Sequence, residues 1–187
     1  MNVTEALPIL LAGDTRLEQR VAAVARVDDA LRGEAARMHA TLDAFRARAG
    51  YGRALAAPQV GVMKRVVVMN LAAAPPAGIG AGPFTLVNPE FLWMSDEWIE
   101  VWDDCLSIPE IVVRVRRRAS VTLKFRDLEW REHVWERVPA DVSELLQHEV
   151  DHLDGILMTA RAYGDDAVRP IAERDALVGD SRRRAAR

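Results

Sequence analysis

The sequence predicts an α+β fold in which antiparallel or mixed β-sheets pack around one central buried helix. The 187 residues are 50% hydrophobic and 28% charged, which suits one compact domain with a substantial core. Apolar patterns with helical spacing occur at residues 28–50 and 141–155, and short segments rich in β-branched residues lie between them. We expect residues 1–178 to form a single domain and residues 179–187 to form an arginine-rich tail.

The composition excludes several classes of protein. No run approaches the roughly 20 apolar residues that cross a bilayer, so we expect no membrane segment. The apolar stretch at residues 6–12 contains Pro8 and follows Glu5, unlike a secretory signal. The net charge of −3 does not indicate DNA binding. Because Cys105 is the only cysteine, an intramolecular disulfide is excluded, and we expect a cytoplasmic protein.

The first helix is predicted by apolar residues that alternate at spacings of four and three. These residues are Leu31, Ala35, Met38, Leu42 and Phe45. Asp28 can cap the start of this helix and Gly50 can end it. We therefore expect an N-terminal helix with one face on the core.

A series of short apolar segments after this helix predicts strands. They are residues 65–71, 84–87, 97–103, 111–115, 120–128 and 134–138. Val121, Leu123 and Phe125 alternate with polar residues, so their strand should have one buried face. Prolines and glycines at residues 75–83 predict a surface loop.

The second helix is predicted to begin at Asp141 and to end at Gly155. Asp141 and Glu144 have the spacing of a capping box. Apolar residues occur on most of its sides: Val142, Leu145, Leu146, Val150 and Leu153. A helix that is apolar nearly all round should be buried at the centre of the domain.

This central helix carries the pattern H-E-x-x-H. His148 and His152 are four residues apart, so they share a helix face and can reach one metal ion, with Glu149 beside them. A carboxylate in that place can take a proton from water. Because a buried charge must be paired, hydrogen-bonded or bound to metal, burial favours a metal site over two surface histidines.

The residues alone leave several candidates for a third ligand. Glu173 could serve as the later glutamate of a thermolysin-like enzyme, although such enzymes are normally larger. His39 lies on the amphipathic helix and His133 in a predicted hairpin turn, where histidines have ordinary roles. Cys105 follows a predicted strand, and its alternative role is that of a small buried hydrophobic residue.

Three segments together resemble the peptide deformylase family, whose motifs are G-x-G-L-A-A-x-Q, E-G-C-L-S and H-E-x-D-H. Here they read GRALAAPQ at residues 52–59, DDCLS at residues 103–107 and HEVDH at residues 148–152. Their order and spacing are also similar, and the resemblance covers roughly residues 7–177. Each motif is weak alone, but three in order are specific.

The resemblance implies a metal-dependent hydrolase that removes the formyl group from N-formylmethionyl peptides and releases formate. Three side chains would hold one divalent ion: Cys105, His148 and His152. Glu149 would be the general base, and Gln59 and the backbone N–H of Leu106 would stabilise the oxyanion. The family favours Fe(II), and Zn(II), Ni(II) or Co(II) can occupy such a site.

The resemblance also implies partners and substrate contacts. The expected substrate-binding residues are Gly52, Ala54, Leu55, Asp104 and Leu145. A helix at residues 168–187, ending in arginines, would be the segment that contacts the ribosome. Two alternatives are a hydrolase of another small formylated amine or amide, and a non-catalytic metal- or peptide-binding homologue. The latter should lack Glu149 or Gln59, and both are present.

The chain departs from the family motifs around the substrate rather than around the metal. Ala54 replaces the second glycine of the first motif, and Asp103 and Asp104 replace Glu-Gly in the second. Asp104 could meet a charged substrate group or point to solvent. Val112 stands where family members commonly have an arginine, and Arg114 is a candidate substitute.

Two charged residues of the central helix carry separate expectations. Glu144 lies one turn before His148, near the pocket that receives a methionine side chain in the family, but we expect it to be exposed. Asp151 is expected to be structural and to pair with a cation such as Arg117.

Overall fold

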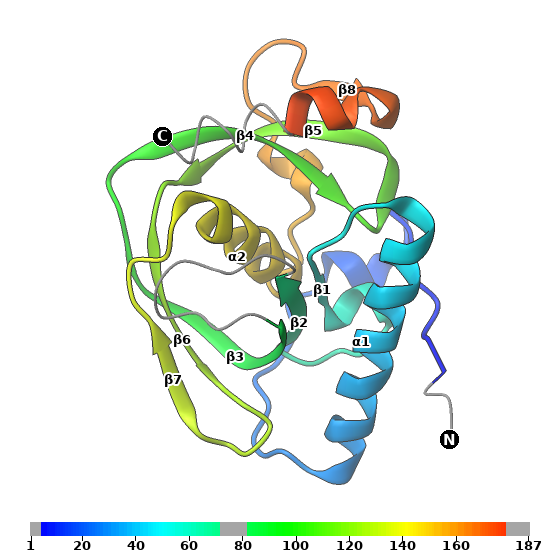
Figure 1. The fold of residues 1–187 in the computed structure, drawn as a ribbon, viewed down its shortest axis with the longest axis vertical. Helices are drawn as coiled ribbons and strands as arrows, with labels where there is room; N and C mark the ends of the chain where they lie inside the picture. Colours follow the sequence, from blue (N-terminus) through cyan, green and yellow to red (C-terminus); the bar gives the residue numbers. More distant parts are fainter. Residues whose placement is uncertain (1–4, 72–81, 179–187) are drawn as a thin grey trace.

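The fold encloses one helix between two antiparallel sheets. The computed structural model describes residues 5–71 and 82–178. Helix α2 (Ala140–Leu153) contacts strands of both sheets, and helix α1 (Asp29–Ala49) packs outside against the first sheet (Figure 1). The α+β prediction is confirmed, including the central position of α2.

The strands form two sheets within the described residues. The first sheet has the order β1-β2-β3-β6-β7. Its strands are β1 (Ala54–Ala56), β2 (Val66–Leu71), β3 (Gly82–Met94), β6 (Val121–Arg126) and β7 (Glu132–Trp135). The second sheet has the order β4-β5-β8. Its strands are β4 (Trp98–Cys105), β5 (Ile108–Arg118) and β8 (Val168–Pro170).

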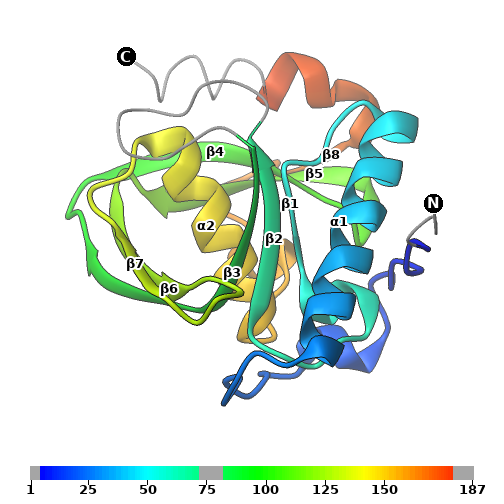
Figure 2. The same ribbon diagram turned by 60° about the horizontal axis from the view of Figure 1, so that its bottom comes forward.

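The sequence correctly predicted the limits of α1. The Asp28 carboxylate accepts a hydrogen bond from the Leu31 backbone N–H, and Gly50 ends the helix with a left-handed φ of 77°. The five apolar residues that predicted this helix are buried. They pack on β1 and β2, which lie between α1 and α2 (Figure 2).

Helix α2 is buried as predicted, but its predicted capping box is wrong. The residue before its first turn is Pro139, which has no side-chain cap. Glu144 turns instead toward Arg53, with which it forms an ion pair. The expectation that Glu144 is exposed is also wrong, since 6% of its surface is exposed. A charged partner far along the chain outweighs a local backbone hydrogen bond here.

Several predicted strand limits need correction. β5 covers Ile108–Arg118 rather than residues 111–115, and β6 ends at Arg126 rather than at residue 128. β3 continues well beyond the predicted residues 84–87, because irregular register after Val87 lets the strand pass Pro89 and still pair with β6. The last strand of the first sheet ends at Trp135 rather than at residue 138. Arg137 has a φ of 44°, which is incompatible with a strand.

The C-terminal helix predicted at residues 168–187 is only partly correct. Residues 168–170 pair with β5 as β8, with Val168 opposite Val113. Pro170 would break the interior of a helix, which explains the extended start. A short helix follows at residues 174–178, whereas the predicted tail at residues 179–187 lies outside the described residues.

Short 3-10 helices and turns connect these elements. They are η1 (Thr15–Glu18), η2 (Ala57–Val60), η3 (Met158–Arg161) and η4 (Ile171–Glu173). Of the loop predicted at residues 75–83, Gly82 and Pro83 begin β3 and the other residues are outside the described range. No helix in the described part of the chain is long and apolar enough to cross a membrane.

The end of α2 depends on close contact with the N-terminal segment. The Val21 backbone N–H donates to the Leu153 carbonyl at 2.9 Å. Gly155 then turns the chain with a φ of 74°, and a Cβ atom there would lie 2.6 Å from the Glu18 carbonyl oxygen. This position requires glycine both for its backbone angle and for the space.

We predict that Gly155→Ala lowers the free energy of unfolding by about 2–4 kcal/mol, because it adds a steric clash to an unfavourable φ. Gly33→Ala is the matched control, since Gly33 lies in α1 and a Cβ atom there would meet nothing within 4 Å. It should raise stability by about 0.5–1 kcal/mol. Urea denaturation measures both, and equal effects would contradict the packing described at Gly155.

Candidate metal centre

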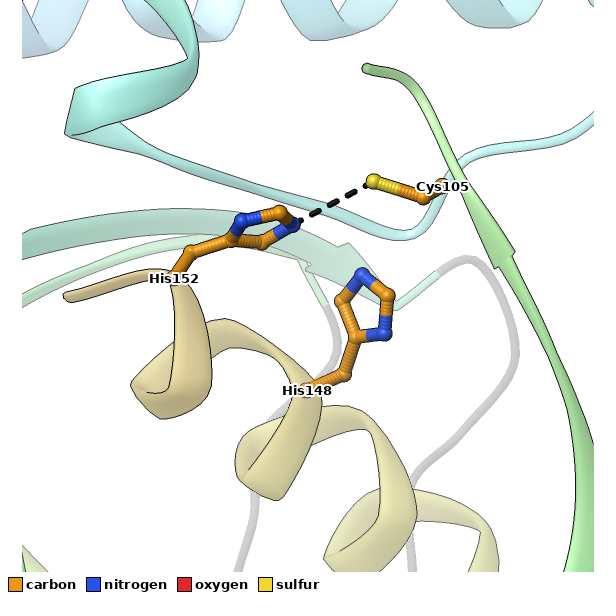
Figure 3. A group of neighbouring side chains, drawn as sticks. All are labelled: Cys105, His148 and His152. Carbon is orange, nitrogen blue, oxygen red and sulfur yellow. Dashed lines mark hydrogen bonds between the residues drawn. The ribbon is translucent and has the colours of Figure 1, made fainter. Parts of the chain in front are cut away.

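Three buried side chains converge at one point between β4 and α2. Cys105 ends β4, and His148 and His152 come from successive turns of α2 (Figure 3). Their potential ligand atoms all lie within 4.8 Å of one another, and Cys105 Sγ is 3.3 Å from His152 Nε2. One thiolate and two imidazoles are a donor set for a tetrahedral metal ion with one open position.

The other candidate ligands lie elsewhere. The His39 ring is 3.0 Å from the Thr85 hydroxyl, and Glu173 bonds to Arg169. His133 lies in β7 rather than in the predicted turn, with Nε2 at 2.7 Å from an Asp127 carboxylate oxygen. Among the described residues, the structure therefore brings Cys105 alone of these candidates to the histidine pair.

Asp103 orients the first histidine. His148 Nδ1 lies 3.0 Å from Asp103 Oδ2, which directs the other ring nitrogen, Nε2, toward the cysteine side. Burial alone would raise the pKa of Asp103, but the charge of Arg117 and the hydrogen bond from His148 outweigh it and hold the pKa well below its usual value. Asp103 is therefore an anionic hydrogen-bond acceptor for the His148 ring.

Arg117 connects this acceptor to α2. Its guanidinium donates to Asp103 Oδ2 at 2.7 Å and to Asp151 Oδ2 on α2, and only 3% of its surface is exposed. The predicted pair of Asp151 and Arg117 is thus confirmed. Arg161, which is largely exposed, adds a bond of 2.8 Å to the other oxygen of Asp151.

The residues at this centre fit a metal ion. Burial lowers the pKa of His152 well below its usual value, so its ring is neutral as a ligand requires. Within the described residues, Glu149 Oε2 is among the buried polar atoms without a hydrogen-bond partner. An unsatisfied carboxylate oxygen beside a Cys-His-His group is what a site built for an ion and a water molecule would show.

Glu149 lies buried in a pocket beside the histidines. It is 4% exposed and lines a small pocket that also reaches His148 and Gln59. Burial raises the pKa of Glu149 to about 7. A general base is most effective when its pKa is near the working pH, so this carboxylate can accept and return a proton.

Gln59 projects from η2 toward the same point. Its Oε1 accepts a hydrogen bond of 2.9 Å from the Ala56 backbone N–H, which fixes the amide. Its Nε2 donates to Ser107 Oγ at 3.1 Å and lies 3.6 Å from Cys105 Sγ. Gln59 and Leu106 line the pocket beside Glu149, the positions expected for oxyanion donors.

Of the five expected substrate-binding residues, three line this pocket and two do not. Ala54, Asp104 and Leu145 line the pocket. Leu55 is fully buried in the core and Gly52 packs beside Phe45 and Leu106, so neither lines it.

The departures from the family motifs have definite places in the structure. Asp104 pairs with Arg174 of the C-terminal segment at 2.8 Å and is largely buried, so it does not point to solvent. Val112 is fully buried. Arg114 does not replace the missing arginine, because its guanidinium donates to the carbonyls of Tyr163 and Asp165 and it does not line the pocket.

Sequence reasoning missed two residues of this site. Asp103 is two residues before Cys105 in β4, so the alternation of a strand already placed it on the same face as the cysteine. Arg53 lies 91 residues from Glu144, and no local spacing could reveal their contact.

We predict that Arg117→Met lowers the free energy of unfolding by about 3–5 kcal/mol, because Asp103 and Asp151 lose their buried cation. It should also weaken zinc binding by about 10- to 100-fold, since Asp103, the hydrogen-bond acceptor of the His148 ring, is no longer held in place by Arg117. Arg161→Met is the control and should change stability by at most about 1 kcal/mol, as the exposed partner of Asp151. Denaturation and zinc titration measure both effects, and similar values for the two variants would contradict the role of Arg117.

Known proteins are similar to this chain in sequence and in fold. The model of the family described as polypeptide deformylase matches residues 6–167. A peptide deformylase of Wolbachia pipientis wMel is 38% identical over 157 residues, covering 81% of this chain and 84% of that protein.

Two crystal structures extend the comparison. Peptide deformylase from Thermotoga maritima has a TM-score of 0.75 and 31% identity, covering 86% of this chain and 99% of that chain. The class I type b peptide deformylase from Acinetobacter baumannii, with Met-Ala-Ser bound, has a TM-score of 0.70 and 33% identity, covering 85% of this chain and 99% of that chain. This chain belongs to the polypeptide deformylase family.

Proposed function

We propose that this chain is a metal-dependent hydrolase that removes the formyl group from N-formylated peptides, N-formylmethionyl peptides among them. The observation that carries this proposal is the buried group of Cys105, His148 and His152 with Glu149 in the adjoining pocket. The bound Met-Ala-Ser of the Acinetobacter baumannii structure is the peptide that remains when a formyl group is removed from formyl-Met-Ala-Ser.

The reaction adds water to the formyl carbon and breaks its bond to the amine nitrogen, giving formate and a free amine. Glu149 would take the proton of the attacking water and deliver it to the departing nitrogen, which suits a pKa of about 7. Gln59 Nε2 and the Leu106 backbone N–H would stabilise the oxyanion. Loss of one such donor costs typically about 3–4 kcal/mol of barrier.

The three ligands would hold a divalent ion that acts as a Lewis acid and lowers the pKa of bound water. We propose iron(II) as the resident ion, with zinc, nickel and cobalt also accepted, because imidazole and thiolate ligands suit all of them. The support for iron(II) is the family resemblance.

Location and partners are further parts of this proposal. We place the protein in the cytoplasm, with a ribosome contact through residues 168–187. The support is the arginine-rich composition at residues 182–187 and the family resemblance. Residues 168–170 are held in β8, so the contact would lie beyond that strand.

The decisive experiment is anaerobic release of formate from formyl-Met-Ala-Ser by protein loaded with iron(II), nickel or zinc. Glu149→Gln should retain one metal per chain and lose about 10²–10⁴-fold in kcat, because the base is not a ligand. Glu132→Gln, an exposed carboxylate on β7, is the control and should keep the parent rate.

Each outcome has a separate meaning. Full activity of Glu149→Gln would refute the assigned base. Absence of formate release with every metal would refute formyl hydrolysis and favour a non-catalytic homologue. Turnover of small formylated amines but not of peptides would favour the alternative substrate class.

A further inference from the structure

A second pocket opens on the first sheet, between the start of β3 and the β6–β7 hairpin. It has a volume of about 360 Å³, which lies within the range of about 300–1,000 Å³ that is usual for small-molecule sites. The pocket exists because two neighbouring strands separate. β3 pairs with β6 from Val87, opposite Arg126, whereas in the described sheet residues 83–85 pair with β2 alone.

Buried aromatic rings form the inner wall of this pocket. The Trp135 ring meets the rings of Phe84 and Phe125 edge to face, with centroids 5.2 and 4.8 Å apart. Phe125 and Trp135 belong to the core that packs against α2, so their rings are held in place. The face of an aromatic ring carries partial negative charge, so such a wall attracts apolar groups and cations.

Two carboxylates line the more exposed part of the pocket. The side chains of Asp127 and Glu129 are 21% and 54% exposed. Asp127 Oδ1 accepts hydrogen bonds from the backbone N–H groups of Glu129 and Arg131, and His133 Nε2 lies 2.7 Å from Asp127 Oδ2. Burial opposes the ionisation of Asp127, but these bonds outweigh it and hold the pKa below its usual value. Asp127 is therefore an anion at neutral pH.

The charge of the pocket is negative. Among the described residues that line it are these two carboxylates and His133, but no lysine or arginine. Arg32 approaches Glu129 to 3.5 Å, but both side chains are substantially exposed, and such a pair is weak. A carboxylate oxygen can accept two hydrogen bonds, so Asp127 Oδ2 has capacity for a further donor.

We propose that this pocket binds a small aromatic ammonium compound, with the ring against Phe84 and Trp135 and the ammonium group at Asp127 and Glu129. The aromatic wall would remove the ring from water, and the carboxylates would accept the hydrogen bonds of the cation. An anion of the same shape would be repelled by both carboxylates. The inference is independent of the proposed function, because the catalytic pocket has different lining residues.

The test measures the binding of three indoles that differ only in their end group: tryptamine, tryptophol and indole-3-propionate. Near neutral pH they carry an ammonium, a hydroxyl and a carboxylate. Titration calorimetry of the full chain should give a dissociation constant below about 1 mM for tryptamine, at least about tenfold weaker binding of tryptophol, and no binding of indole-3-propionate. In amide NMR spectra, tryptamine should shift the signals of Phe125 and Trp135 and leave that of Glu149 in place.

Variants of the carboxylates test the position of the cation. Asp127→Asn keeps an acceptor oxygen for the two backbone bonds and removes the charge, and it should weaken tryptamine binding by at least about tenfold. If this variant does not fold, the exposed Glu129→Gln should weaken binding by at least about threefold. Glu132→Gln is the control, because Glu132 is an exposed carboxylate of the same hairpin that does not line the pocket. It should keep the parent affinity.

Several outcomes would overturn the inference. They are the absence of tryptamine binding, equal binding of indole-3-propionate, parent affinity in both carboxylate variants, and NMR shifts confined to the catalytic pocket. Each would leave the proposed function standing, since formate release tests that function separately.

Discussion

The buried guanidinium of Arg117 is the contact on which both the fold and the metal centre depend. It comes from the second sheet and binds one carboxylate of that sheet, Asp103, and one of the central helix, Asp151. Asp103 in turn accepts the hydrogen bond that orients the His148 ring. The same interaction thus attaches α2 to the sheet and positions a metal ligand, so stability and metal affinity are coupled.

Helix α2 carries an unusual number of buried polar side chains, and each needs a partner. Gln147 bonds to the backbone of Arg118, and Glu144 pairs with Arg53. Among the described residues, the partners are incomplete at the metal centre, where Glu149 Oε2 and His152 Nδ1 remain without one. The polar side chains of the helix have protein partners along most of its length, and the Glu149 oxygen left without one lies where chemistry can use it.

Local patterns in the sequence predicted the elements whose causes are local. The spacing of apolar residues, Asp28 and Gly50 gave α1 to within a residue, and H-E-x-x-H gave the two histidines on one face. Contacts between segments that are far apart in the sequence could not be predicted from such local patterns. The pair of Arg53 with Glu144 overrode a capping box, and pairing with β5 made a strand of residues that were predicted as helix. The resemblance supplied the third ligand, which the residues alone left open.

The most direct test of this account measures the free energy of unfolding against free Ni(II) concentration. An ion held only by the folded state should add about 1.4 kcal/mol for each tenfold rise above its dissociation constant. Cys105→Ser should abolish this dependence, and His39→Gln, with its ring at Thr85, should keep it. Stability that does not change with nickel, or that changes equally in Cys105→Ser, would contradict a metal centre at Cys105, His148 and His152.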